Sequence, residues 1–420
     1  MSRKPGVYAV LASVCIQMTL GVAYIWSLFQ NGIANTLFEG NHASAQLTFS
    51  LLLATLTIGG ALGGKLGIRY GTRRIVFIGG LILSLGFLGA SFVPPQAGWL
   101  LWITYGIMGG MGMGFTYSTT IACAQKWYPH RKGMITGIIV SSLGLGGVMF
   151  SPAAQWLLQL FGGVGAGEQY TFRVLAIVFF TVCTLGSFFC KNPPEDWRLE
   201  QAAAKPNAVP IKNYTPVQML KSIKFYLCVA TFALACMGGL MMIGFVSPIL
   251  QAHGFNADIA SFGVLVVSMF NAFGRLGWSW LSDKLGRANT IMFMLGGSAV
   301  LSLLVGVISG GGVFVLVAFI GLSYGGVLGT FPVLTADLFG PKHMATNYGF
   351  VLLGFGAGAI AAGQISGHFN NLVVQQGGDI GYMFPAFVIA SACAVTGVVL
   401  MFILKKRRKI DMQKLAAEAT

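Results

Sequence analysis

The stretch Ser268–Arg287, SMFNAFGRLGWSWLSDKLGR, decides the fold, because an amide and a cation interrupt a long apolar segment within it. Asn271 and Arg275 stand four residues apart, so both lie on one face of a helix with 3.6 residues per turn. A cation near the middle of a membrane helix costs roughly 2.5–3.5 kcal/mol on insertion scales, and it normally faces a water-filled cavity or a partner. The stretch therefore predicts a membrane span that carries a fixed positive charge.

Two interpretations of this charge are open. Arg275 either binds an anion or forms a structural ion pair with a neighbouring carboxylate. The sequence places no carboxylate in the middle of any other apolar stretch, so an acid at the same depth is missing. We therefore favour an anion site in which Arg275 binds a carboxylate and Asn271 offers a hydrogen bond.

The composition is that of a polytopic membrane protein. Of the 420 residues, 55% are hydrophobic and only 9% are charged, whereas soluble proteins carry about 25% charged residues. The 59 glycines suit close approach of membrane helices. The sequence holds no metal-ligand cluster, phosphate-binding loop or catalytic triad, so we expect no enzyme, no metal and no cofactor.

Twelve apolar stretches are long enough to cross about 30 Å of hydrocarbon. The first follows two basic residues like a signal peptide, but it is too long for one and lacks a cleavage site, so we expect it to be retained. The sequence thus predicts an all-α membrane protein of twelve transmembrane helices. The stretches occupy residues 8–30, 45–64, 75–93, 99–125, 134–158, 172–190, 225–250, 258–282, 290–309, 312–336, 345–369 and 382–404.

Basic residues fix the orientation. If both termini are cytoplasmic, all of the 26 Lys and Arg residues except Arg173 and Arg275 fall in cytoplasmic segments or tails, as the positive-inside rule requires. The net charge of +15 then reflects topology, and we expect no nucleic-acid partner. The run KKRRK at 405–409 is predicted to anchor at lipid headgroups. We expect a multi-pass, monomeric protein of the cytoplasmic (inner) membrane.

One long polar segment, residues 191–224, contains five prolines. It predicts a cytoplasmic linker with one surface helix. The linker divides the chain into an N-terminal half, 1–190, and a C-terminal half, 225–404, which a basic tail, 405–420, follows. Two similar six-helix halves around a central site are typical of secondary transporters.

Short basic loops after the second and eighth spans echo one another. They read GKLGIRYGTR at 64–73 and SWLSDKLGR at 279–287. Here the chain resembles the major facilitator superfamily, whose loop signature is G-x-x-x-D-R/K-x-G-R-R/K. The resemblance implies a role in conformational gating for Asp283 and Arg287 in the second copy and for Gly71 and Arg73 in the first. Ile68 stands where the first copy should have aspartate, which puts the usual charge contact between spans two and eleven in doubt.

Further motifs resemble the oxalate/formate antiporter family, which is related to the monocarboxylate transporters of animals. They are GVAYIWS at 21–27, KWYPHRKG at 126–133, ADLFG at 336–340 and NYGF at 347–350. By this resemblance Arg275 matches the family's anion-binding arginine. Tyr24, Tyr117 and Tyr324 fall where the family has cavity aromatics, although packing is the alternative for each.

Two departures from these relatives bear on the substrate. Phe355 stands where oxalate carriers have a second cation, a lysine, and Asn271 stands where animal monocarboxylate transporters have an acid. With Phe355, three leucines, Leu28, Leu143 and Leu145, are expected to give the cavity an apolar wall. A single fixed cation and an apolar wall indicate a small organic monoanion.

These features predict a secondary transporter of small monocarboxylates of the lactate or pyruvate type, working by alternating access. The resemblance to monocarboxylate transporters implies proton-coupled symport, with the proton itself as a partner. Anion exchange of the oxalate/formate type and efflux of drugs or metabolites are the alternatives within transport. A non-transporting membrane carboxylate sensor is the alternative outside it, although the linker and tail leave little room for an output domain.

Overall fold

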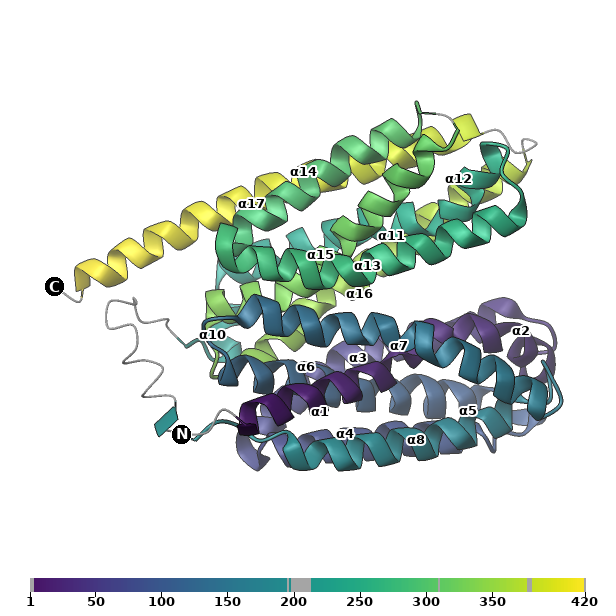
Figure 1. Ribbon diagram of the computed structural model, residues 1–420, viewed down its shortest axis with the longest axis horizontal. Coiled ribbons are helices and arrows are strands. Elements are labelled where there is room, and N and C mark those ends of the chain that lie inside the picture. The colour runs from purple at the N-terminus through teal and green to yellow at the C-terminus, as the bar shows by residue number, and fades with distance from the viewer. Residues whose placement is uncertain (1–3, 195, 198–212, 309, 376–379, 419–420) are drawn as a thin grey trace. The chain divides into compact units, whose positions relative to one another are not determined.

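The computed structural model describes residues 4–194, 196–197, 213–308, 310–375 and 380–418. The regular structure of these residues is helical, without a strand among them (Figure 1). Eleven of the described helices are long and apolar enough to cross a membrane. The prediction of an all-α membrane protein is confirmed.

The first of two compact units comprises Met1–His130, Ser142–Ala208 and Pro341–Phe350. A buried aromatic cluster lies at its centre, where the ring of Tyr105 is 4.9 Å from Trp26 and 4.6 Å from Phe87 between centroids. The helices are α1 (Lys4–Leu20), α2 (Trp26–Leu37), α3 (His42–Tyr70), α4 (Thr72–Ala90), α5 (Trp99–Leu101), α6 (Gly110–Trp127), most of α7 (Lys132–Leu160) and α8 (Glu168–Phe189).

The second unit comprises Arg131–Ser141, Val209–Gly340 and Val351–Thr420. Its apolar core contains Met241, Phe245 and Phe387. Helix α17 continues past the ends of its neighbours α11 and α14 (Figure 1). The helices are α10 (Pro216–Leu220), α11 (Ile223–Gly244), α12 (Val246–Ala252), α13 (Ala257–Leu285), α14 (Arg287–Val305), α15 (Gly312–Phe339), most of α16 (Met344–Gln375) and α17 (Phe384–Glu418).

Two predicted spans of the first unit are not uniform α-helices. A 3₁₀ turn, η1 (Gly21–Ile25), separates α1 from α2. A Cβ on Gly21 would lie 2.5 Å from the carbonyl oxygen of Leu143, so the missing side chain lets α7 approach this turn. The predicted span 99–125 contains a π-helical stretch, η3 (Trp102–Gly109). Irregular turns of this kind often mark functional positions in membrane helices.

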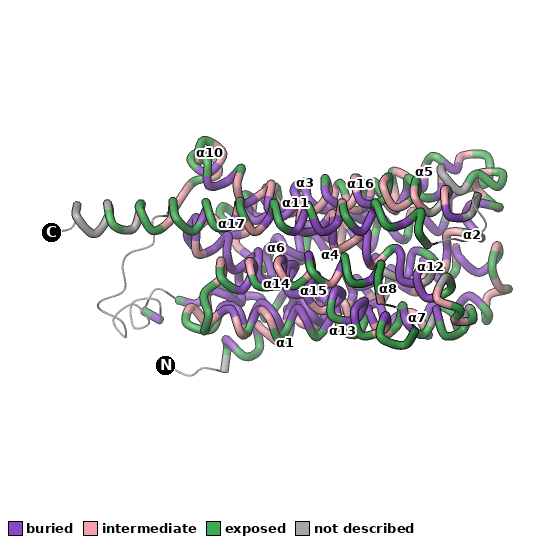
Figure 2. Tube along the Cα trace, turned by 90° about the horizontal axis from the view of Figure 1, so that it is seen from above, coloured by how far each residue is buried: buried purple, intermediate pink, exposed green. Residues whose placement is uncertain are grey.

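Exposed positions recur along the helices (Figure 2), and many of them carry large apolar side chains. Phe293 is 70% exposed, Ile177 66% and Ile360 66%. Soluble monomers rarely leave so much apolar surface in water. These side chains are suited to contact with lipid tails, which agrees with the predicted membrane spans.

Candidate substrate-binding site

Asn271 and Arg275 form the centre of the candidate site in the second unit. Both side chains are buried, with exposed fractions of 9% and 3%. The Nε atom of Arg275 donates a hydrogen bond to Oδ1 of Asn271 at 3.0 Å. Its Nη1 atom donates to the carbonyl oxygen of Val140 on α7 at 3.2 Å. Both acceptors are uncharged, so neither cancels the charge of the guanidinium.

Small residues bring α7 and α15 against this part of α13. Ser141 Oγ donates to the carbonyl oxygen of Ala272 at 2.9 Å. On α15, a Cβ on Gly325 would lie 1.9 Å from the carbonyl oxygen of Asn271, and one on Gly329 would lie 2.6 Å from that of Arg275. The backbone around the cation is therefore held by close helix contacts, which limits the positions that the arginine can take.

Tyr324 and Phe355 belong to the same unit. Tyr324 is buried on α15, and its ring packs on Gly239 of α11, where a Cβ would meet Cδ2 at 2.4 Å. It lines a small cavity together with Ser298 and Ser302. Phe355 is half-buried on α16 with its ring centroid 6.5 Å from that of Phe232.

The other predicted site residues lie in the first unit. Tyr117 is buried on α6, with its hydroxyl 3.5 Å from that of Tyr348. Its carbonyl oxygen accepts a hydrogen bond from Nε2 of Gln17 at 3.1 Å, so α1 and α6 are joined at this point.

The three leucines differ in environment. Leu28 is half-buried on α2, Leu143 is buried on α7, and Leu145 is 46% exposed. The backbone of Tyr24 lies in η1, but its side chain lies outside the described residues. The structure thus brings Asn271 and Arg275 into direct contact, whereas a role for the residues of the first unit stays a prediction.

A second cluster joins four charged residues, Lys132, Asp283, Arg287 and Asp337, which we term the four-residue charge network. Asp283 accepts hydrogen bonds from the backbone N–H groups of Gly133 and Met134, at 3.0 and 2.9 Å, and pairs with Arg287. Asp283 belongs to α13, and its carboxylate complements the partial positive charge at the N-terminus of α7.

Asp337 joins the two cations of this network. Its Oδ1 lies 3.0 Å from Nζ of Lys132, and its Oδ2 lies 3.2 Å from Nε of Arg287. Sequence reasoning identified Asp283 and Arg287 as gating candidates but missed Lys132 and Asp337. A signal existed, since Asp337 is an acid near the end of an apolar span, but its partner is 205 residues away.

The first copy of the loop is built differently. Gly71 has a φ of 86° where α3 gives way to α4, a backbone conformation that favours glycine. The guanidinium of Arg73 lies over the ring of Phe188, 4.4 Å from its centroid. A Cβ on Gly64 would lie 2.2 Å from the backbone nitrogen of Thr346. Backbone packing between α3 and α16 thus occurs beside Ile68, which has no charge to offer.

Comparison with known proteins gives a consistent result. The profile of the Major Facilitator Superfamily matches residues 9–363. The Escherichia coli (strain K12) protein named "Uncharacterized MFS-type transporter YhjX" is 31% identical over 83% of this chain and 85% of that protein. The oxalate:formate antiporter of Oxalobacter formigenes is 28% identical over 91% of each chain.

More distant similarities point to the same fold. Apicoplast pyruvate carrier 1 of Toxoplasma gondii is 23% identical over 83% of this chain and 81% of that protein. The crystal structure of the E. coli fucose:proton symporter FucP matches with a TM-score of 0.67 at 12% identity, over 94% of this chain and 98% of that one. At this identity the structural likeness shows the fold alone.

Proposed function

This chain belongs to the Major Facilitator Superfamily, and from that premise we propose that it transports small monocarboxylates, of the size of lactate or pyruvate, by proton-coupled symport. It is a multi-pass membrane transporter with a helical fold. The similarity to a pyruvate carrier and to an oxalate:formate antiporter supports a carboxylate as the substrate. The cytoplasmic (inner) membrane is the proposed location.

The buried guanidinium of Arg275 carries this proposal. Its hydrogen bonds to Asn271 and to the carbonyl of Val140 orient it without cancelling its charge. A planar guanidinium can bind a carboxylate through two parallel hydrogen bonds, and such charge-assisted bonds are stronger than neutral ones. In this proposal Arg275 binds the carboxylate and Asn271 donates from its amide nitrogen.

The lack of a cation at position 355 would favour a substrate with one carboxylate over one with two. In the proposal a monocarboxylate places its only charge on Arg275 and its short tail against apolar side chains. A dicarboxylate would leave a second desolvated charge without a cation, at a cost of several kcal/mol. The half-buried ring of Phe355 supplies no such cation.

Symport would need a proton carrier other than residue 271. A carboxylate with a raised pKa is the usual proton carrier in a membrane, but an amide occupies position 271. We propose that the proton travels with the acid itself or on a group at the end of a span. An unloaded carrier would have to close around the uncompensated charge of Arg275, which is unfavourable. Exchange of one anion for another avoids this step, so exchange should be easy whichever group carries the proton.

Uptake into proteoliposomes tests the proposal. Labelled lactate or pyruvate should accumulate in liposomes that contain no internal substrate, and an inward proton gradient should stimulate this uptake. A protonophore should abolish the stimulation. If neither labelled acid is taken up or bound, the proposed substrate class is overturned.

Anion exchange is the second candidate, favoured by the 28% identity to an oxalate:formate antiporter over 91% of each chain. The same liposomes separate it from symport. Exchange predicts uptake only after preloading with a carboxylate, and this uptake should not respond to a pH gradient.

A further inference from the structure

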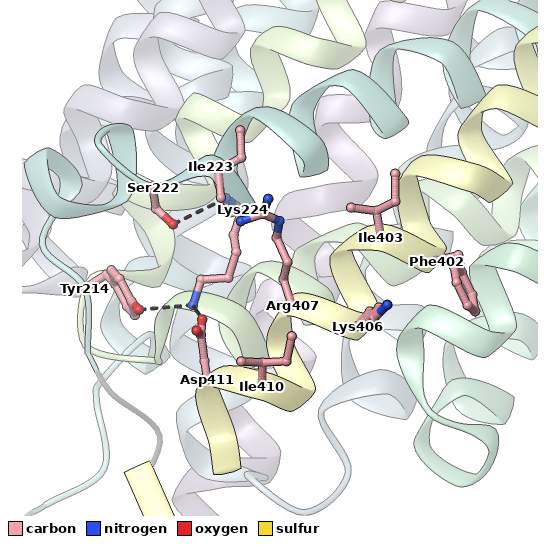
Figure 3. Close-up of a pocket in the computed structure, with 10 residues that line it drawn as sticks. All are labelled: Tyr214, Ser222, Ile223, Lys224, Phe402, Ile403, Lys406, Arg407, Ile410 and Asp411. Carbon is pink, nitrogen blue, oxygen red and sulfur yellow. Dashed lines mark hydrogen bonds and ion pairs between the residues drawn. The ribbon is translucent and has the colours of Figure 1, made fainter. Parts of the chain in front are cut away.

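A cavity of about 780 Å³ lies in the second unit, where the C-terminal part of α17 passes the beginning of α11 (Figure 3). It is separate from Arg275 and from the four-residue charge network. Positive side chains and apolar side chains both line it. The lining residues are Tyr214, Ser222, Ile223, Lys224, Phe402, Ile403, Lys406, Arg407, Ile410 and Asp411.

The charge in this cavity is positive on balance. Three cations, Lys224, Lys406 and Arg407, face a single carboxylate, Asp411. Nζ of Lys224 lies 2.7 Å from Oδ2 of Asp411 and 3.1 Å from the hydroxyl of Tyr214, which hold the lysine in place. The carboxylate thus compensates one cation, and the cavity retains a surplus of positive charge for an anion.

The start of α11 adds to the positive potential of the cavity. Ser222 caps the helix by accepting a hydrogen bond from the backbone N–H of Lys224 at 3.3 Å. Figure 3 shows Arg407 extending from α17 toward these first residues of α11. The N-terminus of a 22-residue helix favours negative charge nearby. Side chains from α17 and the N-terminus of α11 therefore act on the same space.

Apolar residues beside the cations make the cavity amphipathic. Phe402 is 58% exposed, Ile403 38% and Ile223 50%. Phe402 and Ile403 each precede one of the two cations of α17, Lys406 and Arg407, by four residues, so each apolar side chain lies one helical turn nearer the membrane span. An inorganic anion would gain nothing from this apolar surface, whereas an amphiphile would cover it.

We propose that this cavity binds the headgroup of an anionic phospholipid. Its phosphate lies against Lys406 and Arg407 near the start of α11, and its acyl chains run along Phe402 and Ile403. The predicted orientation places this end of both helices at the cytoplasmic surface, where membranes concentrate anionic lipids. The basic tail thereby contributes a defined lipid site between two helices, beyond a general attraction to headgroups.

Thermal unfolding of the purified full-length protein in neutral detergent tests the site. Dioleoylphosphatidylglycerol should raise the melting temperature in a saturable way, whereas dioleoylphosphatidylcholine and inorganic phosphate should not. Lys406→Gln with Arg407→Gln should raise the half-saturating phosphatidylglycerol concentration by about tenfold or more.

A matched double variant controls for net charge. Lys405 and Lys409 lie on the same helix outside the cavity lining, and Nζ of Lys405 donates to Oδ1 of Asn289 on α14. Lys405→Gln with Lys409→Gln removes the same charge and should leave the half-saturating concentration near that of the wild type. An equal loss in both doubles would overturn the site, and so would stabilisation by phosphate alone.

Native mass spectrometry of the wild type keeps the test independent of how well the variants fold. The protein should retain phosphatidylglycerol in preference to phosphatidylcholine when both are supplied in equal amounts. Equal retention of the two lipids would overturn the proposal.

Discussion

The Nε atom of Arg275 lies 3.0 Å from the amide oxygen of Asn271, one turn earlier on α13. The pair orients a buried cation with a neutral acceptor, so this contact does not neutralise the guanidinium. An acid at position 271 would orient the arginine equally well but would neutralise it. This difference motivates the first two predictions.

Arg275→Ala should abolish uptake of lactate and pyruvate while the protein still inserts and folds, because the variant removes a costly buried charge. Arg275→Lys should retain little uptake, since an ammonium cannot reproduce two parallel hydrogen bonds to a carboxylate. Phe273→Ala is the matched control, because this neighbour on α13 is 58% exposed and should transport normally. Near-normal uptake by the alanine variant at 275 would refute the proposed site.

Asn271→Asp should place a carboxylate beside the guanidinium and compete with the substrate. We expect the KM for lactate to rise roughly tenfold at neutral pH, equivalent to about 1.4 kcal/mol of lost binding. The KM should stay raised across the near-neutral pH range, because the adjacent guanidinium favours the ionised form of the new carboxylate. Uptake by the variant and by the wild type across a pH series checks this. A variant KM that equals the wild-type KM at every pH would contradict the assigned contact.

Phe355→Lys should improve the competition of oxalate against labelled lactate, because it restores a second cation where oxalate carriers have one. Phe355→Met keeps an apolar side chain and should preserve the preference for monocarboxylates. Competition assays on the three proteins measure the change. If oxalate already binds more tightly than lactate to the wild type, the charge argument is wrong.

Asp337→Asn should destabilise the second unit, because Lys132 and Arg287 would lose the carboxylate between them. The side chain of Asp337 is 17% exposed, so breaking this buried network should cost about 3 kcal/mol. Asp411→Asn breaks another aspartate–lysine pair, but Asp411 is 45% exposed and the loss should be about 1 kcal/mol or less. Equal shifts in thermal unfolding would show that burial does not govern these pairs.

His343, just before α16, should make stability depend on pH. Burial, together with the charges of Lys342 and Lys126, lowers its pKa below the ordinary value of 6.5. The unfolded chain therefore takes up the proton more readily than the folded one, so stability is full above pH 6.5 and falls as the pH drops below it. His343→Gln should weaken this fall in melting temperature, whereas His130→Gln, at an exposed position, should not.

Local properties of the sequence determined the spans, the orientation expected for them, and the helix face that carries Asn271 and Arg275. A helix satisfies its own backbone hydrogen bonds, so hydrophobicity over about 20 residues is enough to identify a membrane span. The four-residue spacing likewise made the contact between the two side chains predictable, because neighbours one turn apart meet on a helix.

Tertiary structure alone decided which distant groups these charges contact. The carbonyl of Val140 reaches Arg275 across 135 residues, Asp337 joins Lys132 across 205, and Lys224 meets Asp411 across 187. Such pairs depend on how closely helices approach, and this depends on glycines such as Gly325 and Gly329, at which even a methyl group would collide with α13. Hydropathy and periodicity act within one helix, whereas packing between helices sets the partners of a buried charge.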